Sequence, residues 1–179
     1  SIKSLLNLYG FDSTGFQLTE YGGSTAEHNP TIITNDSQDF LEGFKHVKGN
    51  VSQSAGATAH GGTIIVDGNA SSRCGISMKG VDIIIKGSVG HMSGFMAQSG
   101  TLLICGDAGE ALGDSIYETV IYIAGTPKSL GADCVEKKIT KKDLIKIEEL
   151  IKLGNIKKIK SNEFKKYGSA RKLYNFKID

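Results

Sequence analysis

Hydrophobic residues in this chain fall into short runs that return every 19 residues, between positions occupied mainly by glycine. Each run holds about five residues and is rich in isoleucine and valine. Runs of this kind that end at glycine are typical of a β-strand followed by a turn. We therefore expect five strands, at residues 43–49, 62–68, 81–87, 100–106 and 119–125.

Two columns of glycine keep the same period without an interruption. Such regularity predicts a repeat architecture in which each glycine marks a corner of the chain. Glycine is favoured at such corners because the backbone has a positive φ there, or because the next repeat comes too close for a Cβ atom. The first column is Gly49, Gly68, Gly87, Gly106 and Gly125, and the second is Gly56, Gly75, Gly94 and Gly113.

Aligned positions of the five expected strands form columns that point alternately inward and outward, because successive side chains of a strand lie on opposite faces. Two columns are almost entirely aliphatic, so we expect them to point inward and to stack from repeat to repeat. They are Val47, Val66, Ile85, Ile104 and Ile123, and Lys45, Ile64, Ile83, Leu102 and Ile121.

The column between these two should point outward, although most of its members are apolar or aromatic. An apolar stripe outside a solenoid needs a cover, which we expect to be either the chain's own C-terminal helix or another subunit. The column is His46, Ile65, Ile84, Leu103 and Tyr122.

A second, shorter strand is expected after each glycine of the second column. These strands would span residues 57–60, 76–79, 95–98 and 114–117, with Ala59, Met78, Ala97, Ile116 and Val135 pointing inward. A 19-residue repeat is too short for a pair of helices, lacks the leucine-rich pattern, and is not a multiple of six as a hexapeptide coil requires. The predicted fold class is all-β, a single-stranded parallel β-helix with 19-residue coils.

The chain divides into three regions. A weakly patterned N-terminal segment (1–42) precedes the β-helix (43–137), and a C-terminal helix with a basic, aromatic arm follows (138–179). Thr140 and Asp143 resemble a capping box, and Gly154 is a stop signal, which predicts a helix over about 140–153. Such a helix would cap the solenoid, whose end otherwise exposes strand edges.

The net charge of +2 hides an asymmetry along the chain. Residues 1–136 carry 7 basic and 14 acidic side chains, whereas residues 137–179 carry 14 basic and 5 acidic ones. A basic tail can bind nucleic acid. Here apolar residues are interspersed with the lysines, which favours a solvated helix face or docking on an acidic neighbour.

Composition narrows the class of protein further. The 23 glycines come with only two prolines, which excludes a collagen-like chain. No apolar run is long enough to span a membrane, and the first residues lack the pattern of a signal peptide. The chain does not begin with Met, so we expect it to be processed or incomplete at its start. Cys74, Cys105 and Cys134 lack a C-x-x-C spacing, which favours reduced thiols and a cytoplasmic protein.

Few residues suggest catalysis. Asp114 and Asp133 fall in one column of adjacent coils, where a carboxylate pair about 4.8 Å apart could cleave a polysaccharide. Turn capping is the more common role of such residues. His60 and His91 are isolated at turns and do not favour a metal site.

We therefore predict no catalytic, cofactor-binding or metal-binding residue in this chain. Arg73 and Lys79 should protrude from the second coil, either as plain surface charges or as contacts to another subunit. The candidate partner contacts are Ile65, Arg73, Lys79, Ile84, His91, Leu103 and Tyr122.

Several runs resemble the GXGXG domain, the right-handed parallel β-helix at the C-terminal end of the large subunit of glutamate synthase, which is also found as a free-standing subunit. The runs span residues 68–80, 87–98, 106–115, 129–137 and 167–174, and the likeness covers about residues 45–179. Among free-standing forms they look like the one found in N-methylglutamate synthase, also called methylamine–glutamate N-methyltransferase.

The resemblance implies a non-catalytic scaffold subunit in a hetero-oligomer, without nucleic acid or membrane. Its partners would be a glutamine-amidotransferase-like subunit and a synthase-like subunit that carries FMN and an iron–sulfur cluster. The whole enzyme would make N-methylglutamate from methylamine and glutamate. Two alternatives stay open: a stand-alone polysaccharide hydrolase or lyase that uses Asp114 and Asp133, and the β-helix subunit of formylmethanofuran dehydrogenase.

Overall fold

The computed structural model describes residues 16–17, 31–32 and 44–171. These residues form a nine-stranded sheet, one α-helix and a short 3-10 helix. In chain order the elements are β1 (Phe16–Gln17), β2 (Thr31–Ile32), β3 (Phe44–Val47), β4 (Thr63–Val66), β5 (Lys79–Ile85), β6 (Ser99–Ile104), β7 (Val120–Ile123), β8 (Cys134–Lys137), α3 (Lys141–Leu153), η1 (Ser161–Glu163) and β9 (Lys165–Ser169).

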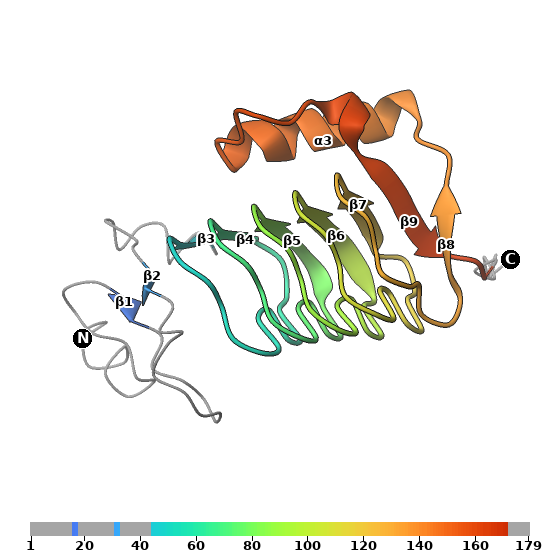
Figure 1. Cartoon of the computed structure of the whole chain (residues 1–179), viewed down its shortest axis with the longest axis horizontal. Helices are drawn as coiled ribbons and strands as arrows, with labels where there is room; N and C mark the ends of the chain where they lie inside the picture. Colours follow the sequence, from blue (N-terminus) through green and yellow to red (C-terminus); the bar gives the residue numbers. More distant parts are fainter. Residues whose placement is uncertain (1–15, 18–30, 33–43, 172–179) are drawn as a thin grey trace, which may run out of the picture.

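Five consecutive strands, β3 to β7, pair in parallel at an offset of 19 residues, apart from one shift at Lys79. Figure 1 shows the chain winding through them as a row of similar coils. The predicted parallel β-helix is therefore confirmed, with about four turns. Antiparallel strands close both ends of the parallel part, β2 beside β3 and β9 beside β7.

Stacked aliphatic side chains fill the interior of the solenoid. Ile83, Leu102 and Ile121, which occupy the same position of successive coils, are all at most 1% exposed. Because equivalent residues lie about 4.8 Å apart, each side chain fills the space beneath its equivalent in the next coil. Each such burial contributes about 1.5–3 kcal/mol, which is how a chain without tryptophan builds a continuous core.

The two columns require glycine for two different reasons. All four members of the column that begins at Gly56 have φ between +67° and +73°, a conformation that strains a residue with a Cβ atom. In the other column, a Cβ on Gly87 would lie 2.7 Å from the carbonyl oxygen of Gly68 in the preceding coil. A Cβ on Gly68, Gly106 or Gly125 would lie similarly close to the backbone of the preceding glycine in the column. A Cβ on Gly49 would have no atom within 4 Å.

The prediction of a second strand in each coil is wrong. Residues 57–60, 76–79, 95–98 and 114–117 each begin with two residues in a turn and form no separate strand, although β5 begins at Lys79. Met78, Ala97 and Ile116 are nevertheless buried in the interior, as expected. A sequence pattern that places every second residue inside does not distinguish a strand from a series of turns with the same alternation.

The turns have a regular backbone. In the second coil Arg73, Gly75 and Ser77 all have positive φ, and this trio recurs at equivalent positions of the coils before and after it. The Ile76 N–H donates to the carbonyl oxygen of Arg73, and the Met78 N–H donates to that of Gly75. Two consecutive i to i+3 turns with a positive φ at their third residue therefore bend the chain, as in type II turns.

Backbone hydrogen bonds between coils continue through these turns. The Arg73 N–H donates to the His91 carbonyl of the following coil at 2.8 Å, and the Gly75 N–H donates to the Ala55 carbonyl of the preceding coil at 2.8 Å. Successive coils are thus joined at the corner as well as along the sheet, which satisfies backbone groups that would otherwise need water.

Side chains join the coils at the other corner, directly after the first glycine column. The Asn69 N–H donates to Asn50 Oδ1 at 2.7 Å, and the Ser88 N–H donates to Asn69 Oδ1 at 2.8 Å. The Asp107 N–H then donates to Ser88 Oγ at 3.0 Å, and the Thr126 N–H donates to Asp107 Oδ1 at 2.8 Å. In each case a side-chain oxygen of one coil, instead of a backbone carbonyl, accepts the hydrogen bond from a backbone N–H of the next coil.

The last coil is one residue shorter than the others. Asp114 Oδ2 accepts a hydrogen bond from the Ala132 N–H, 18 residues later and 3.2 Å away. Ala132 is therefore the equivalent of Asp114, and the predicted alignment of Asp114 with Asp133 is wrong. Val135, expected in the interior, lies in β8 and is 39% exposed, because the chain has already left the coil there.

The chain then reverses to form a C-terminal cap. β9 pairs antiparallel with both β7 and β8, and α3 lies across the outer side of the sheet (Figure 1). The predicted helix is confirmed, with a capping box between Thr140 and Asp143 and a C-cap at Gly154.

The glycine constraints give a direct test of the coil geometry. We expect Gly87→Ala to lower the free energy of unfolding by about 2 kcal/mol, because its Cβ would clash with the backbone of the preceding coil. Gly49→Ala is the matched control in the same column and should change it by less than about 0.5 kcal/mol. Urea unfolding followed by circular dichroism measures both, and equal losses would contradict the close packing of coils.

Candidate functional site

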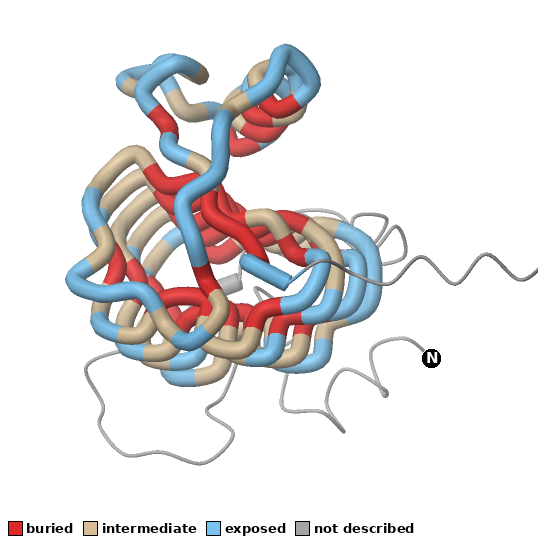
Figure 2. Tube along the Cα trace, turned by 90° about the vertical axis from the view of Figure 1, so that its right-hand side faces the viewer, coloured by how far each residue is buried: buried red, intermediate tan, exposed pale blue. Residues whose placement is uncertain are grey.

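The outward apolar column is covered by the chain's own helix. A second hydrophobic core, separate from the interior, lies between the sheet and α3. Figure 2, which looks along the coils, shows the buried side of α3 above the buried strands. Four of the candidate partner contacts are thus buried within this chain. They are Ile65, Ile84, Leu103 and Tyr122, which pack with Ile147, Leu150 and Phe164.

Asp143, in the first turn of α3, joins the helix to the rest of the cap. Its Oδ1 accepts hydrogen bonds from Tyr122 Oη and Lys166 Nζ, both at 2.7 Å. Its Oδ2 accepts from the Thr140 N–H at 2.7 Å and from Thr140 Oγ1 at 2.6 Å. One buried carboxylate therefore connects β7, β9 and the helix start.

The charge of Asp143 is stabilised by these donors. Burial by itself would raise the pKa of Asp143, but the hydrogen bonds from its three partners outweigh burial and hold the pKa well below its ordinary value. Burial and the neighbouring carboxylate raise the pKa of Tyr122, so its hydroxyl remains a donor.

Two further charged contacts flank the second core. Lys146 of α3 binds Asp82 of β5 at 2.7 Å, which fixes the helix over the middle of the sheet. Directly after β4, Asp67 Oδ1 lies 2.9 Å from His46 Nε2 and 2.7 Å from Lys86 Nζ. Burial acts to raise the pKa of Asp67, but these two neighbours outweigh it and lower the pKa. His46, the polar member of the outward column, thus has a charged partner instead of an apolar cover.

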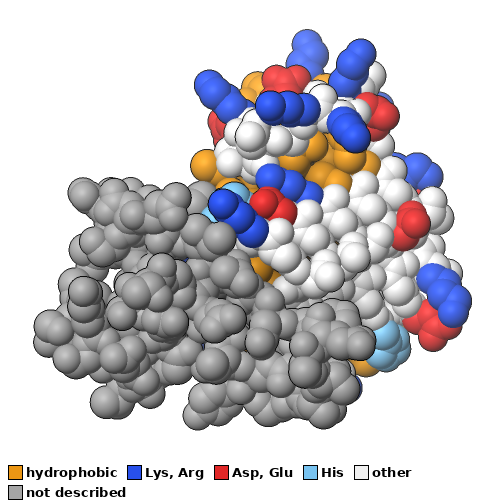
Figure 3. Space-filling model, turned by 60° about the vertical axis from the view of Figure 1, so that its left-hand side comes forward, with side chains coloured by type: hydrophobic (Ala, Val, Ile, Leu, Met, Phe, Trp, Pro, Cys, Tyr) orange, Lys and Arg blue, Asp and Glu red, His pale blue; other side chains and the backbone are white. Residues whose placement is uncertain are grey.

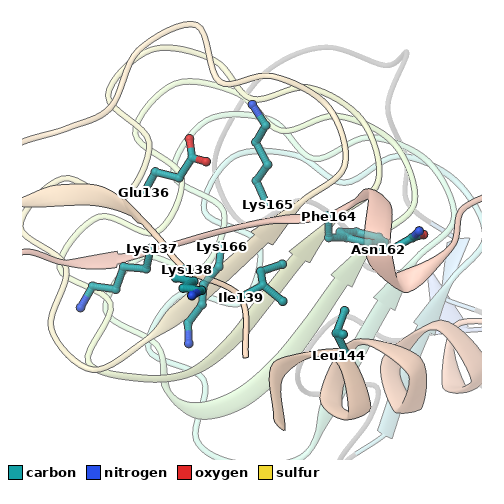
Figure 4. Close-up of a pocket in the computed structure, with 9 residues that line it drawn as sticks. All are labelled: Glu136, Lys137, Lys138, Ile139, Leu144, Asn162, Phe164, Lys165 and Lys166. Carbon is teal, nitrogen blue, oxygen red and sulfur yellow. The ribbon is translucent and has the colours of Figure 1, made fainter. Parts of the chain in front are cut away.

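A cleft of about 380 Å³ opens where β8, β9 and the start of α3 meet, and we call it the cap cleft. In Figure 4, Glu136 and Lys165 extend to the side opposite the one on which α3 lies. Its lining combines four lysines with an apolar floor. The lining residues are Glu136, Lys137, Lys138, Ile139, Leu144, Asn162, Phe164, Lys165 and Lys166.

The described residues offer no metal-binding cluster, since no three His, Cys, Asp or Glu side chains gather among them. His60 and His91 are both exposed, His60 at a single bridge to Lys79 and His91 at a turn. Asp114 and Asp133 have separate partners: Asp114 accepts hydrogen bonds from Ser115 Oγ and from the Ala132 N–H of the next coil, and Asp133 forms an ion pair with Arg171. Asp133 is therefore not stacked on Asp114, which is the arrangement on which the predicted carboxylate pair depended.

The cysteines are also separated. Cys74 and Cys134 lie in the interior, and Cys105 packs against the second core. Burial raises the pKa of Cys74 to about 12 and that of both Cys105 and Cys134 to about 11. All three therefore remain protonated at neutral pH, which suits neither a nucleophile nor a metal ligand.

Charge is distributed unevenly over the surface. Figure 3 shows lysine and arginine side chains gathered over the cap, above a coil face that carries few charges. The remaining candidate partner contacts, Arg73, Lys79 and His91, lie on the coils, where all three are exposed. Among the described residues, no helix is both long and apolar enough for a membrane span.

Sequence reasoning did not find the Asp143 network or the cap cleft. A signal for the network was present, because Tyr122 is the aromatic member of an otherwise aliphatic column and a buried hydroxyl needs a partner. The cleft had no such signal, since it depends on β9 inserting between β7 and β8.

Comparison with known proteins supports a family assignment. The GXGXG motif family matches residues 19–177. The chain belongs to this family. The resemblance to the GXGXG domain that the sequence indicated is thereby confirmed.

Protein GlxC of Rhizobium meliloti (strain 1021) is 54% identical to this member of the GXGXG family over 68 residues. That stretch covers 38% of this chain and 30% of GlxC, so the match spans less than a third of the relative's length. No solved structure matches the chain.

Stability should depend on the ionised Asp143. We expect Asp143→Asn to lower the free energy of unfolding at pH 7 by about 3 kcal/mol, because Lys166 loses its buried partner. Because the folded pKa lies below the unfolded value of about 3.9, the wild-type contribution is present above pH ~4 and is lost as the pH falls further.

Urea unfolding between pH 7 and pH 3 measures this effect. The difference between wild type and Asp143→Asn should shrink as the pH falls below about 4. Glu149→Gln removes an exposed carboxylate from the same helix and should leave both stability and pH dependence nearly unchanged. A constant difference down to pH 3 would contradict the stabilising role of the charge.

Proposed function

We propose that this chain is a scaffold subunit of a multisubunit glutamate-synthase-like enzyme. Its membership of the GXGXG motif family supports this assignment, and the single observation that carries it is the continuous joining of the coils. Hydrogen bonds link successive coils along the sheet and at both corners, so the solenoid presents a rigid surface with fixed spacing between its side chains.

The finer proposal is that the enzyme is N-methylglutamate synthase. In it, a glutamine-amidotransferase-like subunit and an FMN and iron–sulfur synthase-like subunit would carry the chemistry, and this chain would hold them together. The placement of the cysteines supports this division. An iron–sulfur cluster needs several thiolates at one place, whereas Cys74, Cys105 and Cys134 lie in two separate cores with raised pKa values.

The two alternatives receive less support. A stand-alone hydrolase depended on paired carboxylates, and the shorter last coil places Ala132 opposite Asp114. The β-helix subunit of formylmethanofuran dehydrogenase would share the same coil geometry, so its partners and their cofactors must distinguish the two enzymes.

Isolation of the complex tests this proposal. A tagged copy, produced at its natural level in its native cell, should co-purify with a flavoprotein, and the complex should form N-methylglutamate from methylamine and glutamate. Absorbance spectra and metal analysis identify the bound cofactors. Recovery of the chain alone, or with a molybdenum or tungsten protein, would contradict the proposal.

A further inference from the structure

We propose that the cap cleft binds an acidic polypeptide segment of the flavin-bearing partner subunit. The inference rests on the proposed function and identifies the surface at which the partner subunit would bind this chain. It starts from the cleft that β8, β9 and α3 enclose at the end of the solenoid, lined by four lysines.

Positive charge in the cleft exceeds what its own acidic groups neutralise. Lys166 is paired with Asp143. Lys137, Lys138 and Lys165 have no acidic partner within ion-pair distance among the described residues, and Glu136 is the only acidic side chain in the lining. A carboxylate-bearing segment would supply the missing counter-charge, and would be steered toward the cap by its field.

The residues that line the cleft indicate which kind of ligand it can bind. Ile139 and Leu144, both half-buried, line it beside the lysines, so it can receive an apolar side chain between two carboxylates. Phe164 is 3% exposed, and its ring is therefore not available to stack on a base. The lining holds lysines and no arginine, so bidentate contacts to phosphate are also missing. A protein segment fits these features better than a nucleic acid.

The cleft is already shaped without its ligand. The Asp143 network fixes the start of α3 to β7 and β9, and the Lys146–Asp82 ion pair fixes the helix over the sheet. A binding surface that is held in place loses little conformational entropy when a partner docks.

Charge reversal on matched lysine pairs provides the test. Lys137→Glu with Lys138→Glu changes the cleft, while Lys157→Glu with Lys158→Glu makes the same change in net charge at a lysine pair of the cap outside the cleft. Binding of each full-length variant to the purified flavoprotein subunit is measured by surface plasmon resonance at 50 and 300 mM salt, after thermal unfolding has shown that all variants fold.

The cleft pair should weaken binding by about ten-fold or more at 50 mM salt, and the control pair by less than about three-fold. The wild-type affinity should fall with salt, and that of the cleft variant should fall less. Equal effects of the two pairs would overturn the proposal for the cleft and leave the scaffold function standing. Failure of the wild type to bind would overturn both.

Other occupants give different results in the same preparation. If the cleft binds nucleic acid, a 20-nucleotide probe will bind the wild type more tightly than the cleft variant. If it binds the acidic N-terminal region of a second copy, the wild type will self-associate in sedimentation and the cleft variant will not. Either result would overturn the proposal.

Discussion

The hydrogen-bonded ladder between coils is the constraint on which the rest of this structure depends. A parallel ladder fixes the distance from coil to coil at about 4.8 Å, so every coil must repeat the path of the previous one. That requirement explains the regular 19-residue spacing, the aliphatic stacks and the exclusion of Cβ atoms at Gly87 and its equivalents. It also leaves the stacked coils little freedom to move relative to one another, which is the property that the proposed scaffold needs.

The outer face of the sheet is apolar and needs a cover, which the C-terminal cap supplies. A sheet with aliphatic residues on both faces has to be covered on its outer side, and α3 supplies the cover for Ile84 and Leu103. Asp143 then orients the helix through donors from three parts of the chain. The lysine excess therefore sits on a well-fixed element, where it can act as a recognition surface as well as a solvated helix face.

Much of the fold could be predicted from the sequence, because Gly87 and its equivalents recur at the same 19-residue spacing as the coils. The capped helix could be predicted for a similar reason, since Thr140 and Asp143 act locally. The turns around Gly75 could not be predicted, because a strand and a series of turns with positive φ at alternate residues bury the same side chains. The cap cleft depends on β9 inserting beside β7, a long-range pairing that leaves no local pattern.

The coils are joined continuously, through the corners as well as along the sheet. Amide hydrogen exchange followed by NMR on the full chain measures this residue by residue. We expect the amides of Arg73, Gly75 and Ser77 to be protected nearly as strongly as those of β5, with opening free energies close to that of global unfolding. Rapid exchange of these turn amides beside protected strands would show that the coils are joined along the sheet alone, and would contradict a rigid solenoid.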